Sequence, residues 1–195
     1  MRKVILFLII TTLIIACSDK TKTKTKQEMQ FTEQKETIEV RKLGDNHWQT
    51  YTDIIINAPV EKVWKVLSNW DSLSSWSSSL KRIQEDAKNK GNILVSYLVD
   101  GNTYDTPHVL IYEEGEEFGW SDPMEGGFEG LTDNHRFRVE KISDNKTRFI
   151  QSDDFKGPGN KNLSAEDVAN MTVKFFPLFN RELKQEVERT NKNWL

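Results

Sequence analysis

Six strand-like segments follow one another from Leu80 to Phe155, and one long amphipathic segment comes after them. The segments are rich in β-branched and aromatic residues, and they lie at residues 80–85, 93–99, 108–113, 118–121, 132–142 and 148–155. Turn sequences such as Asp100-Gly101 and Glu114-Gly115 separate some of them, and no helical pattern intervenes. Strands connected in this way pair antiparallel, so the order predicts an antiparallel meander and excludes parallel βαβ units.

A long helix is predicted after the last strand. Ser164 and Asp167 form a typical helix start, with a capping residue and an acid in the first turn. Apolar residues then recur every three or four positions, at Val168, Met171, Phe175, Phe179, Leu183 and Val187. This pattern predicts a helix of about 28 residues with a kink at Pro177, which cannot donate a hydrogen bond to the carbonyl of Val173. The helix is the only predicted element large enough to cover an apolar face of the sheet.

One strand and two short helices precede the six segments. Residues 48–56 have the composition of a strand, and Asn57-Ala58-Pro59 ends it. The next residues, VEKVWKVLSNW, have helical spacing after Pro59, and a second short helix is predicted at SLSSWSSSL. Residues 37–43 (TIEVRKL) are a candidate for a further short strand. The predicted fold class is therefore α+β, with the order β-α-α-β(6)-α.

This order and two motifs resemble the START/polyketide-cyclase-like (SRPBCC) superfamily. The first motif comprises Ile56, Ala58-Pro59, Val63-Trp64, Leu67 and Trp76, and the second is HRFRVEKISDNKTRFIQSDDFKG at residues 135–157. The resemblance covers residues 47–193 and implies the helix-grip fold, in which a curved antiparallel sheet wraps around a long carboxy-terminal helix. It also implies a cavity between sheet and helix that takes an apolar or amphipathic small molecule. The resemblance does not identify one function, because the superfamily includes lipid carriers, hormone receptors, cyclases and dehydratases.

Strand parity predicts which side chains would line such a cavity. Successive side chains of a strand point to opposite faces, and the sets that contain several charged residues should face water. The predicted ligand-binding residues are those that point inward on strands, short helices and the final helix: Trp76, Trp120, His135, Phe137, Phe149, Gln151, Asp153, Met171, Phe175 and Phe179.

Three polar residues in this set could take part in catalysis or in hydrogen bonding to a ligand. His135, Gln151 and Asp153 lie on neighbouring strands with the same parity, so their side chains should converge. A carboxylate beside an imidazole orients it and raises its pKa, which suits a general acid/base pair of His135 and Asp153. The same trio would equally bind a ligand carbonyl, or hydrogen-bond only within itself. All three alternatives stay open from the sequence.

No metal or cofactor site is predicted. The chain has one cysteine and three histidines, and His47 and His108 stand singly on predicted strands. The loop at residues 122–134 is rich in glycine and acidic residues, with Met124 and Phe128 expected to be exposed. We expect it to be either a mobile loop that gates the cavity or simple turn structure.

The amino terminus has the pattern of a bacterial lipoprotein signal. Residues 1–17 read MRKVILFLIITTLIIAC, in which two basic residues precede an apolar run that is short for a membrane span. The end of this segment resembles a lipobox, which implies cleavage after Ala16 and lipidation of Cys17; an ordinary signal peptide or an uncleaved anchor is the alternative. The expected organisation is a signal peptide at 1–16, a lipidated tether at 17–46, and the folded domain at 47–195. The expected location is the bacterial cell envelope, on a membrane.

Charge narrows the classes of partner. Removal of Arg2 and Lys3 with the signal peptide changes the formal charge from −3 to −5, which argues against a nucleic-acid partner. We expect a monomer that binds a small hydrophobic, lipid-like ligand, with no enzymatic step required. The alternatives are a cyclase- or dehydratase-type enzyme that uses His135 and Asp153, and an interaction lipoprotein whose cavity is vestigial.

Overall fold

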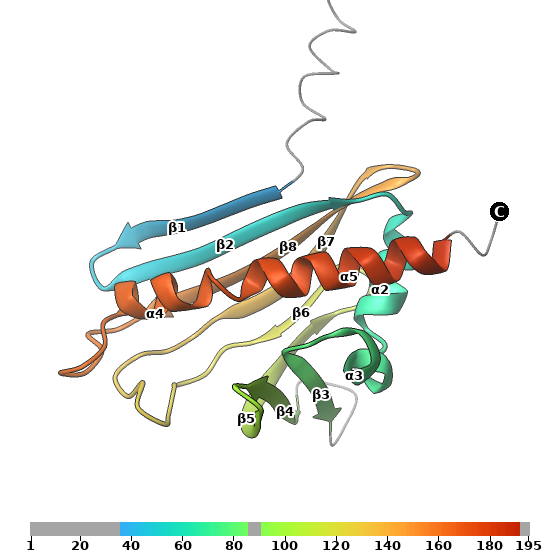
Figure 1. Cartoon of the computed structure of the whole chain (residues 1–195). Helices are drawn as coiled ribbons and strands as arrows, with labels where there is room; N and C mark the ends of the chain where they lie inside the picture. Colours follow the sequence, from blue (N-terminus) through green and yellow to red (C-terminus); the bar gives the residue numbers. More distant parts are fainter. Residues whose placement is uncertain (1–35, 86–90, 192–195) are drawn as a thin grey trace, which may run out of the picture. The chain divides into compact units, whose positions relative to one another are not determined.

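The computed structural model describes residues 36–85 and 91–191, and its main feature is one eight-stranded antiparallel sheet (Figure 1). Its strands are β1 (Glu36–Gly44), β2 (His47–Ile56), β3 (Leu80–Glu85), β4 (Asn92–Val99), β5 (Asn102–Glu113), β6 (Glu117–Trp120), β7 (His135–Ser143) and β8 (Lys146–Lys156). Their order in the sheet is β1-β2-β8-β7-β6-β5-β4-β3. Strands β3 to β8 therefore pair in sequence order, as the short turns predict, and β2 pairs with β8.

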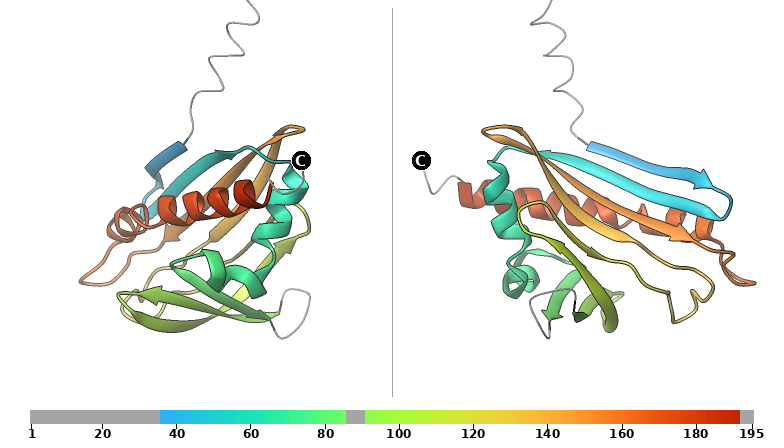
Figure 2. Two further views of the ribbon diagram at one scale, coloured as in Figure 1. Left: turned by 45° about the vertical axis from the view of Figure 1, so that its right-hand side comes forward. Right: turned by 180° about the vertical axis from the view of Figure 1, so that it is seen from behind.

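The helices lie between β2 and β3 and after β8. The first group is α2 (Val60–Leu67), the single 3₁₀ turn η1 (Trp70–Ser72) and α3 (Leu73–Trp76), and the second is α4 (Ala165–Thr172) and α5 (Phe176–Asn191). Figures 1 and 2 show α4 and α5 running along one face of the sheet, where they contact β2 and β8. The predicted α+β helix-grip fold is confirmed. Among the described residues, no helix is both long and apolar enough to cross a membrane.

The sheet begins before the predicted domain start at residue 47. Residues 36–44 form β1, which pairs with β2 from Glu36 opposite Ile54 to Gly44 opposite His47. The candidate strand at residues 37–43 is thus confirmed. The prediction that residues 17–46 are a flexible tether is wrong for residues 36–44, which belong to the sheet. Propensity favours a strand here because Ile38 and Val40 are β-branched. The remainder of the predicted tether and the whole predicted signal peptide lie outside the described residues.

The predicted continuous final helix is two helices. Residues 173–175 form a turn between α4 and α5, in which Lys174 N and Phe175 N donate three residues back, to Met171 O and Thr172 O. The cause is the one expected for a kink, because Pro177 has no N–H for the carbonyl of Val173. The chain responds with tighter turns rather than with a bend, which changes the direction of the side chains at the break itself.

Two clusters of buried side chains form the core. The larger lies between the sheet and helices α2, α3 and α5, and the smaller lies under α4 around Leu131, Phe155 and Val168. Met124 and Phe128 pack against the smaller cluster and are partly buried. The prediction that these two side chains are exposed is therefore wrong. Their burial fixes the loop at residues 122–134 onto α4 by apolar contact.

Candidate functional site

Inward-facing side chains form rows across the sheet beneath the final helices. His135 on β7 lies opposite Trp120 on β6 and Asp153 on β8. In the next row, Phe137 lies opposite Phe118 and Gln151. The inward side chains of both rows are buried, whereas Arg138, of opposite parity on β7, is exposed. The predicted parity of these strands is therefore confirmed.

Aromatic rings fill the centre of this face. Phe118, Trp120, Phe137, Phe149 and Phe179 are each at most 2% exposed. Phe137 lies in the middle, with its centroid 4.8 Å from that of Phe118, 5.3 Å from that of Phe179 and 5.7 Å from that of Trp120. We call these five residues the ring cluster. Since ring pairs at such distances add packing energy beyond apolar burial, the cluster is a rigid floor for the site.

The break before α5 changes which helix residues face the ring cluster. Phe175 is 61% exposed and Met171 is 41% exposed, so the prediction that they point inward is wrong. Phe176 is buried in their place, and its ring stacks on the imidazole of His135. Phe179 points inward as predicted, and half-buried Trp76 of α3 lies against it at a centroid distance of 5.3 Å.

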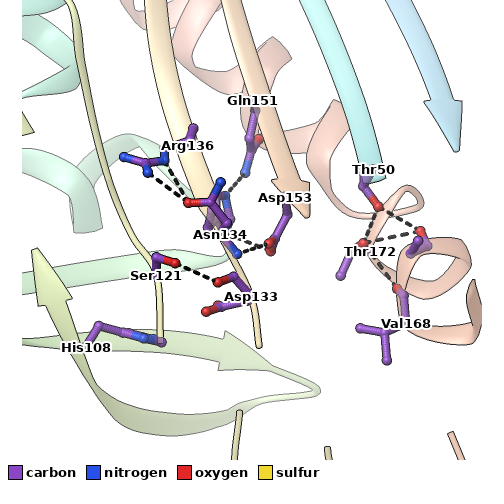
Figure 3. Close-up of polar contacts among 12 residues, drawn as sticks. Thr50, His108, Ser121, Asp133, Asn134, Arg136, Gln151, Asp153, Val168 and Thr172 are labelled. Carbon is purple, nitrogen blue, oxygen red and sulfur yellow. Dashed lines mark hydrogen bonds and ion pairs between the residues drawn. The ribbon is translucent and has the colours of Figure 1, made fainter. Parts of the chain in front are cut away.

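The structure brings the predicted polar trio together. Gln151 Nε2 lies 3.0 Å from His135 Nε2, and His135 Nδ1 lies 3.4 Å from Asp153 Oδ2. Because an amide nitrogen only donates, His135 Nε2 accepts this hydrogen bond, which assigns the ring proton to Nδ1 on the side of Asp153. The other Asp153 oxygen, Oδ1, accepts from the backbone N–H of Asn134 at 3.1 Å (Figure 3). The three side chains of the trio are therefore connected to one another and surrounded by aromatic rings.

Burial controls the charges of the trio. Desolvation, together with smaller effects of nearby His108 and Arg136, lowers the pKa of His135 to about 3. Desolvation likewise raises the pKa of Asp153 well above its ordinary value, with a further contribution from Asp133. The imidazole is therefore neutral near pH 7. A general acid/base works best with a pKa near the working pH, so this environment suits a hydrogen-bonding role better than proton transfer.

A second polar group, which the sequence did not predict, adjoins the first. His108 Nδ1 lies 2.9 Å from Asp122 Oδ1, and the His108 ring stacks on Trp120 at a centroid distance of 4.8 Å. The carboxyl group of Asp133, a residue that is only 7% exposed, joins them. Burial and the neighbouring Asp122 raise the pKa of Asp133 to about 7. Figure 3 draws His108 and Asp133 in one close-up with Gln151 and Asp153.

The chain brings Asp122 and Asp133 together by closing the intervening loop. Pro123 pairs with Thr132 as an isolated bridge, and Asp133 N donates to Asp122 O at 3.1 Å. Asp122 N in turn lies 3.4 Å from Asp133 Oδ1. Sequence analysis missed this group because the three residues have no spacing motif. The only signal in the sequence was that Asp122 begins the loop at residues 122–134 and Asp133 lies one residue before its end.

Several buried polar atoms of the site have no hydrogen-bond partner among the described residues. They are Gln151 Oε1, His108 Nε2 and Trp76 Nε1. Buried polar atoms in proteins nearly always have a partner, which is protein, water or ligand. These atoms come from β8, β5 and α3 and border the ring cluster. They give the site unused capacity for both donating and accepting hydrogen bonds.

Three surface hollows lie away from this site. Two, of about 340 and 360 Å³, are lined by residues around η1 and β3, including Trp70 and Arg82. The third, of about 490 Å³, lies between the β1–β2 turn and the start of α4, next to Trp48 and Ser164. None of the predicted ligand-binding residues lines any of the three.

Comparisons with known proteins define the class. Residues 47–188 match the family model described as "Polyketide cyclase / dehydrase and lipid transport". The fold is similar to that of the Zhui aromatase/cyclase from Streptomyces sp. R1128, with a TM-score of 0.59 and 12% sequence identity over 73% of this chain and 94% of that one. It is also similar to a START superfamily protein from Mycobacterium smegmatis, with a TM-score of 0.57 and 14% identity over 73% and 98% of the two chains. No curated protein matches the chain in sequence.

The chain thus carries a START-like helix-grip domain. Since the family model covers most of its length, the protein belongs to the polyketide cyclase/dehydrase and lipid transport family. The identities to the solved structures are low, so those similarities establish the fold alone.

Proposed function

We propose that the domain binds a small amphipathic, lipid-like molecule, with its apolar part on the ring cluster and its polar end at the His135–Gln151–Asp153 trio. The observation that carries this proposal is the set of unpartnered polar atoms around the ring cluster, above all Gln151 Oε1. A ligand hydroxyl or amide satisfies such an atom and recovers the cost of burying it. The family description, which includes lipid transport, supports the same class of ligand.

The apolar part of the ligand is expected between α3, β4 and α5. Trp76 and Tyr97 both pack on the core cluster yet are only half-buried, so each ring presents further apolar surface. Trp76 lies against Phe179, and Tyr97 lies edge-on to Trp120 with centroids 6.4 Å apart. These contacts place both rings at the border of the same cluster. Apolar burial there contributes roughly 25 cal/mol per Å² to binding.

The charges near the trio favour one class of polar end. Asp122, Asp133 and Asp153 lie around the site, and within the described residues no lysine or arginine forms an ion pair with any of them. Carboxylates at such a site repel an anionic ligand and accept hydrogen bonds from a donor. The preferred ligand therefore carries a hydroxyl, amide or amine rather than a carboxylate.

Acid/base catalysis by His135 and Asp153 is supported less well. The pair has suitable proximity, with 3.4 Å between Nδ1 and Oδ2. However, the His135 ring is enclosed by Phe137 at 4.5 Å and Phe176 at 4.8 Å, and its pKa is lowered to about 3. We therefore assign the pair to ligand binding.

Two probes of equal chain length test this proposal. The full chain is titrated with 1-dodecanol and with dodecanoate at pH 8, in a fixed concentration of mild detergent, and tryptophan fluorescence reports binding. We expect the alcohol to bind at least tenfold more tightly than the carboxylate. Asp153→Asn should narrow this ratio by replacing the carboxyl group beside the polar end, whereas Asp154→Asn, the half-buried neighbour of opposite parity, should preserve it.

Two results would overturn the proposal. If neither probe changes the fluorescence, the ring cluster is closed to ligands, as in an interaction protein with a vestigial cavity. If dodecanoate binds as tightly as the alcohol, the trio does not contact the polar end.

We also propose that Cys17 is lipidated and holds the domain on a membrane of the bacterial cell envelope. The lipobox-like residues before Cys17 support this, and attached acyl chains stabilise membrane binding by about 0.8 kcal/mol per buried methylene. In its native host, the full chain should partition into the detergent phase of Triton X-114, and Cys17→Ala should move it to the aqueous phase. A Cys17→Ala variant that still partitioned wholly into detergent would contradict the proposal.

A further inference from the structure

We propose that His108, Asp122 and Asp133 form a binding site for a divalent transition-metal ion of the Zn²⁺ or Co²⁺ type. One ligand atom from each residue lies within 4.8 Å of those of the other two. One imidazole and two carboxylates are donors that such ions prefer, whereas Mg²⁺ and Ca²⁺ favour oxygen alone. This inference does not rest on the proposed function: the metal would bind His108, Asp122 and Asp133, which border the ligand site, whereas the proposed contacts of the ligand's polar end are His135, Gln151 and Asp153.

The fold holds two like charges together at this position. The Pro123–Thr132 bridge and the backbone hydrogen bond from Asp133 to Asp122 fix the two aspartates side by side. In the described parts of the chain, the only ion pair that either one makes is that of Asp122 with His108. A divalent cation between the carboxylates converts this repulsion into attraction and balances both charges.

His108 is arranged to bind through Nδ1. This nitrogen already points at Asp122 Oδ1, 2.9 Å away, and the side chain of His108 is only 9% exposed. Nε2 has no hydrogen-bond partner among the described residues. In the tautomer that carries the proton on Nε2, Nδ1 is free to bind the ion and the imidazole stays neutral.

The surroundings give the site rigidity and an open coordination position. The His108 ring is stacked on Trp120, with 21° between the ring planes, and Tyr97 lies edge-on to it at 6.5 Å. Packed rings of this kind fix the orientation of a ligand imidazole, as metal sites require. Three protein donors also leave a tetrahedral ion one position for water or another ligand.

Metal alone tests the inference. The purified full chain is freed of metal with EDTA, dialysed, and titrated with Co²⁺ and with Zn²⁺. We expect one equivalent of Co²⁺ to give visible d–d absorption bands, and a hundredfold excess of Zn²⁺ over Kd to raise Tm by roughly 5–10 °C. Asp122→Asn and Asp133→Asn, which keep the shape of the side chain, should each weaken binding at least tenfold.

Matched variants separate this site from adventitious binding. His47→Gln removes a histidine at the start of β2, and Asp154→Asn removes a carboxylate on β8; both should bind metal like the native chain. The inference is overturned if the native chain shows no Co²⁺ bands at one equivalent, a result that needs no variant to fold. It is also overturned if the control variants lose as much affinity as the two site variants.

Discussion

The ring of Phe176 stacks on the imidazole of His135, with centroids 4.8 Å apart and 29° between the ring planes. This contact exists because the final helix breaks at residues 173–175. In an unbroken helix, the spacing from Val168 would point Phe175 at the sheet. After the break Phe176 takes the inward position, so it covers the polar trio and Phe175 faces outward, while Phe179, Leu183 and Val187 are buried as the pattern predicts.

The first prediction compares these two adjacent phenylalanines. Phe176→Ala should destabilise the protein by about 3–5 kcal/mol, because it opens a cavity beside His135. Phe175→Ala should change stability by less than about 0.5 kcal/mol, since its ring is 61% exposed. Urea unfolding of both variants measures the difference. Equal effects would contradict the assigned break in the helix.

Much of the fold could be predicted from local pattern. The turn sequences and alternating strands gave the antiparallel order, because short connections allow few other pairings. Strand parity placed His135, Phe137 and Gln151 inward, since the opposite faces carry arginines. The helix break could not be located, because Pro177 removes one hydrogen bond but does not specify whether the chain bends or turns. Phe175 was assigned inward for that reason, whereas Met171 precedes the break and lies off the buried face of α4, which is formed by Ala165, Val168 and Ala169.

The candidate site could be predicted only in part. The trio lies on adjacent strands at matching register, so periodicity alone was sufficient to bring its members together. The group of His108, Asp122 and Asp133 depends on the path of a loop between β6 and β7. Loop closure is set by tertiary contacts, including the packing of Met124 and Phe128 on the smaller core cluster, and no periodic pattern encodes it.

The second prediction concerns the pH dependence of stability at His135. Its pKa falls from the ordinary 6.5 to about 3 in the folded protein, so between these values the unfolded chain binds a proton that the folded chain does not. Stability therefore rises with pH across this window, by at most about 1.4 kcal/mol per pH unit for this residue. His135→Gln should remove that contribution and flatten the curve. Urea unfolding at pH 4.5, 5.5 and 6.5 measures both slopes.

The same experiment contains its own control. Above pH 7 the imidazole is neutral in both folded and unfolded native chains, so the stability difference between the variant and the native protein should become constant. Asp153 contributes with the opposite sign, because its raised pKa makes stability fall as pH rises, and it is present in both proteins. If the free energy of unfolding changed with pH equally in the native protein and in His135→Gln from pH 4.5 to 6.5, folding would not lower the pKa of His135.

The third prediction concerns Gly119, which lies opposite Arg136 in the β6–β7 pair. A Cβ atom at this position would lie 1.9 Å from the backbone oxygen of His135, so Gly119→Ala should destabilise the protein by about 3 kcal/mol or more and displace the trio. Gly44→Ala is the matched control, since its added Cβ would make an ordinary contact at 3.8 Å with His47. Thermal unfolding compares them. A native-like Tm for Gly119→Ala would mean that β6 and β7 are not held in this register.

The fourth prediction separates the two final helices. Thr50 Oγ1 on β2 donates to Ala169 O in α4 at 2.8 Å and lies 2.6 Å from Thr172 Oγ1, and Thr50 is fully buried (Figure 3). Thr50→Val should remove this link at a cost of about 1–2 kcal/mol and speed amide exchange in α4 several-fold more than in α5. Hydrogen–deuterium exchange measures both helices.

The control for this fourth prediction is Thr52→Val, two residues along β2. Thr52 Oγ1 accepts from Asn180 Nδ2 in α5 at 2.8 Å, so its loss should speed exchange in α5 rather than in α4. Opposite selectivity in the two variants would mean that α4 can open while α5 stays in place over the ring cluster. Equal acceleration in both helices in either variant would show instead that α4 and α5 open as one unit.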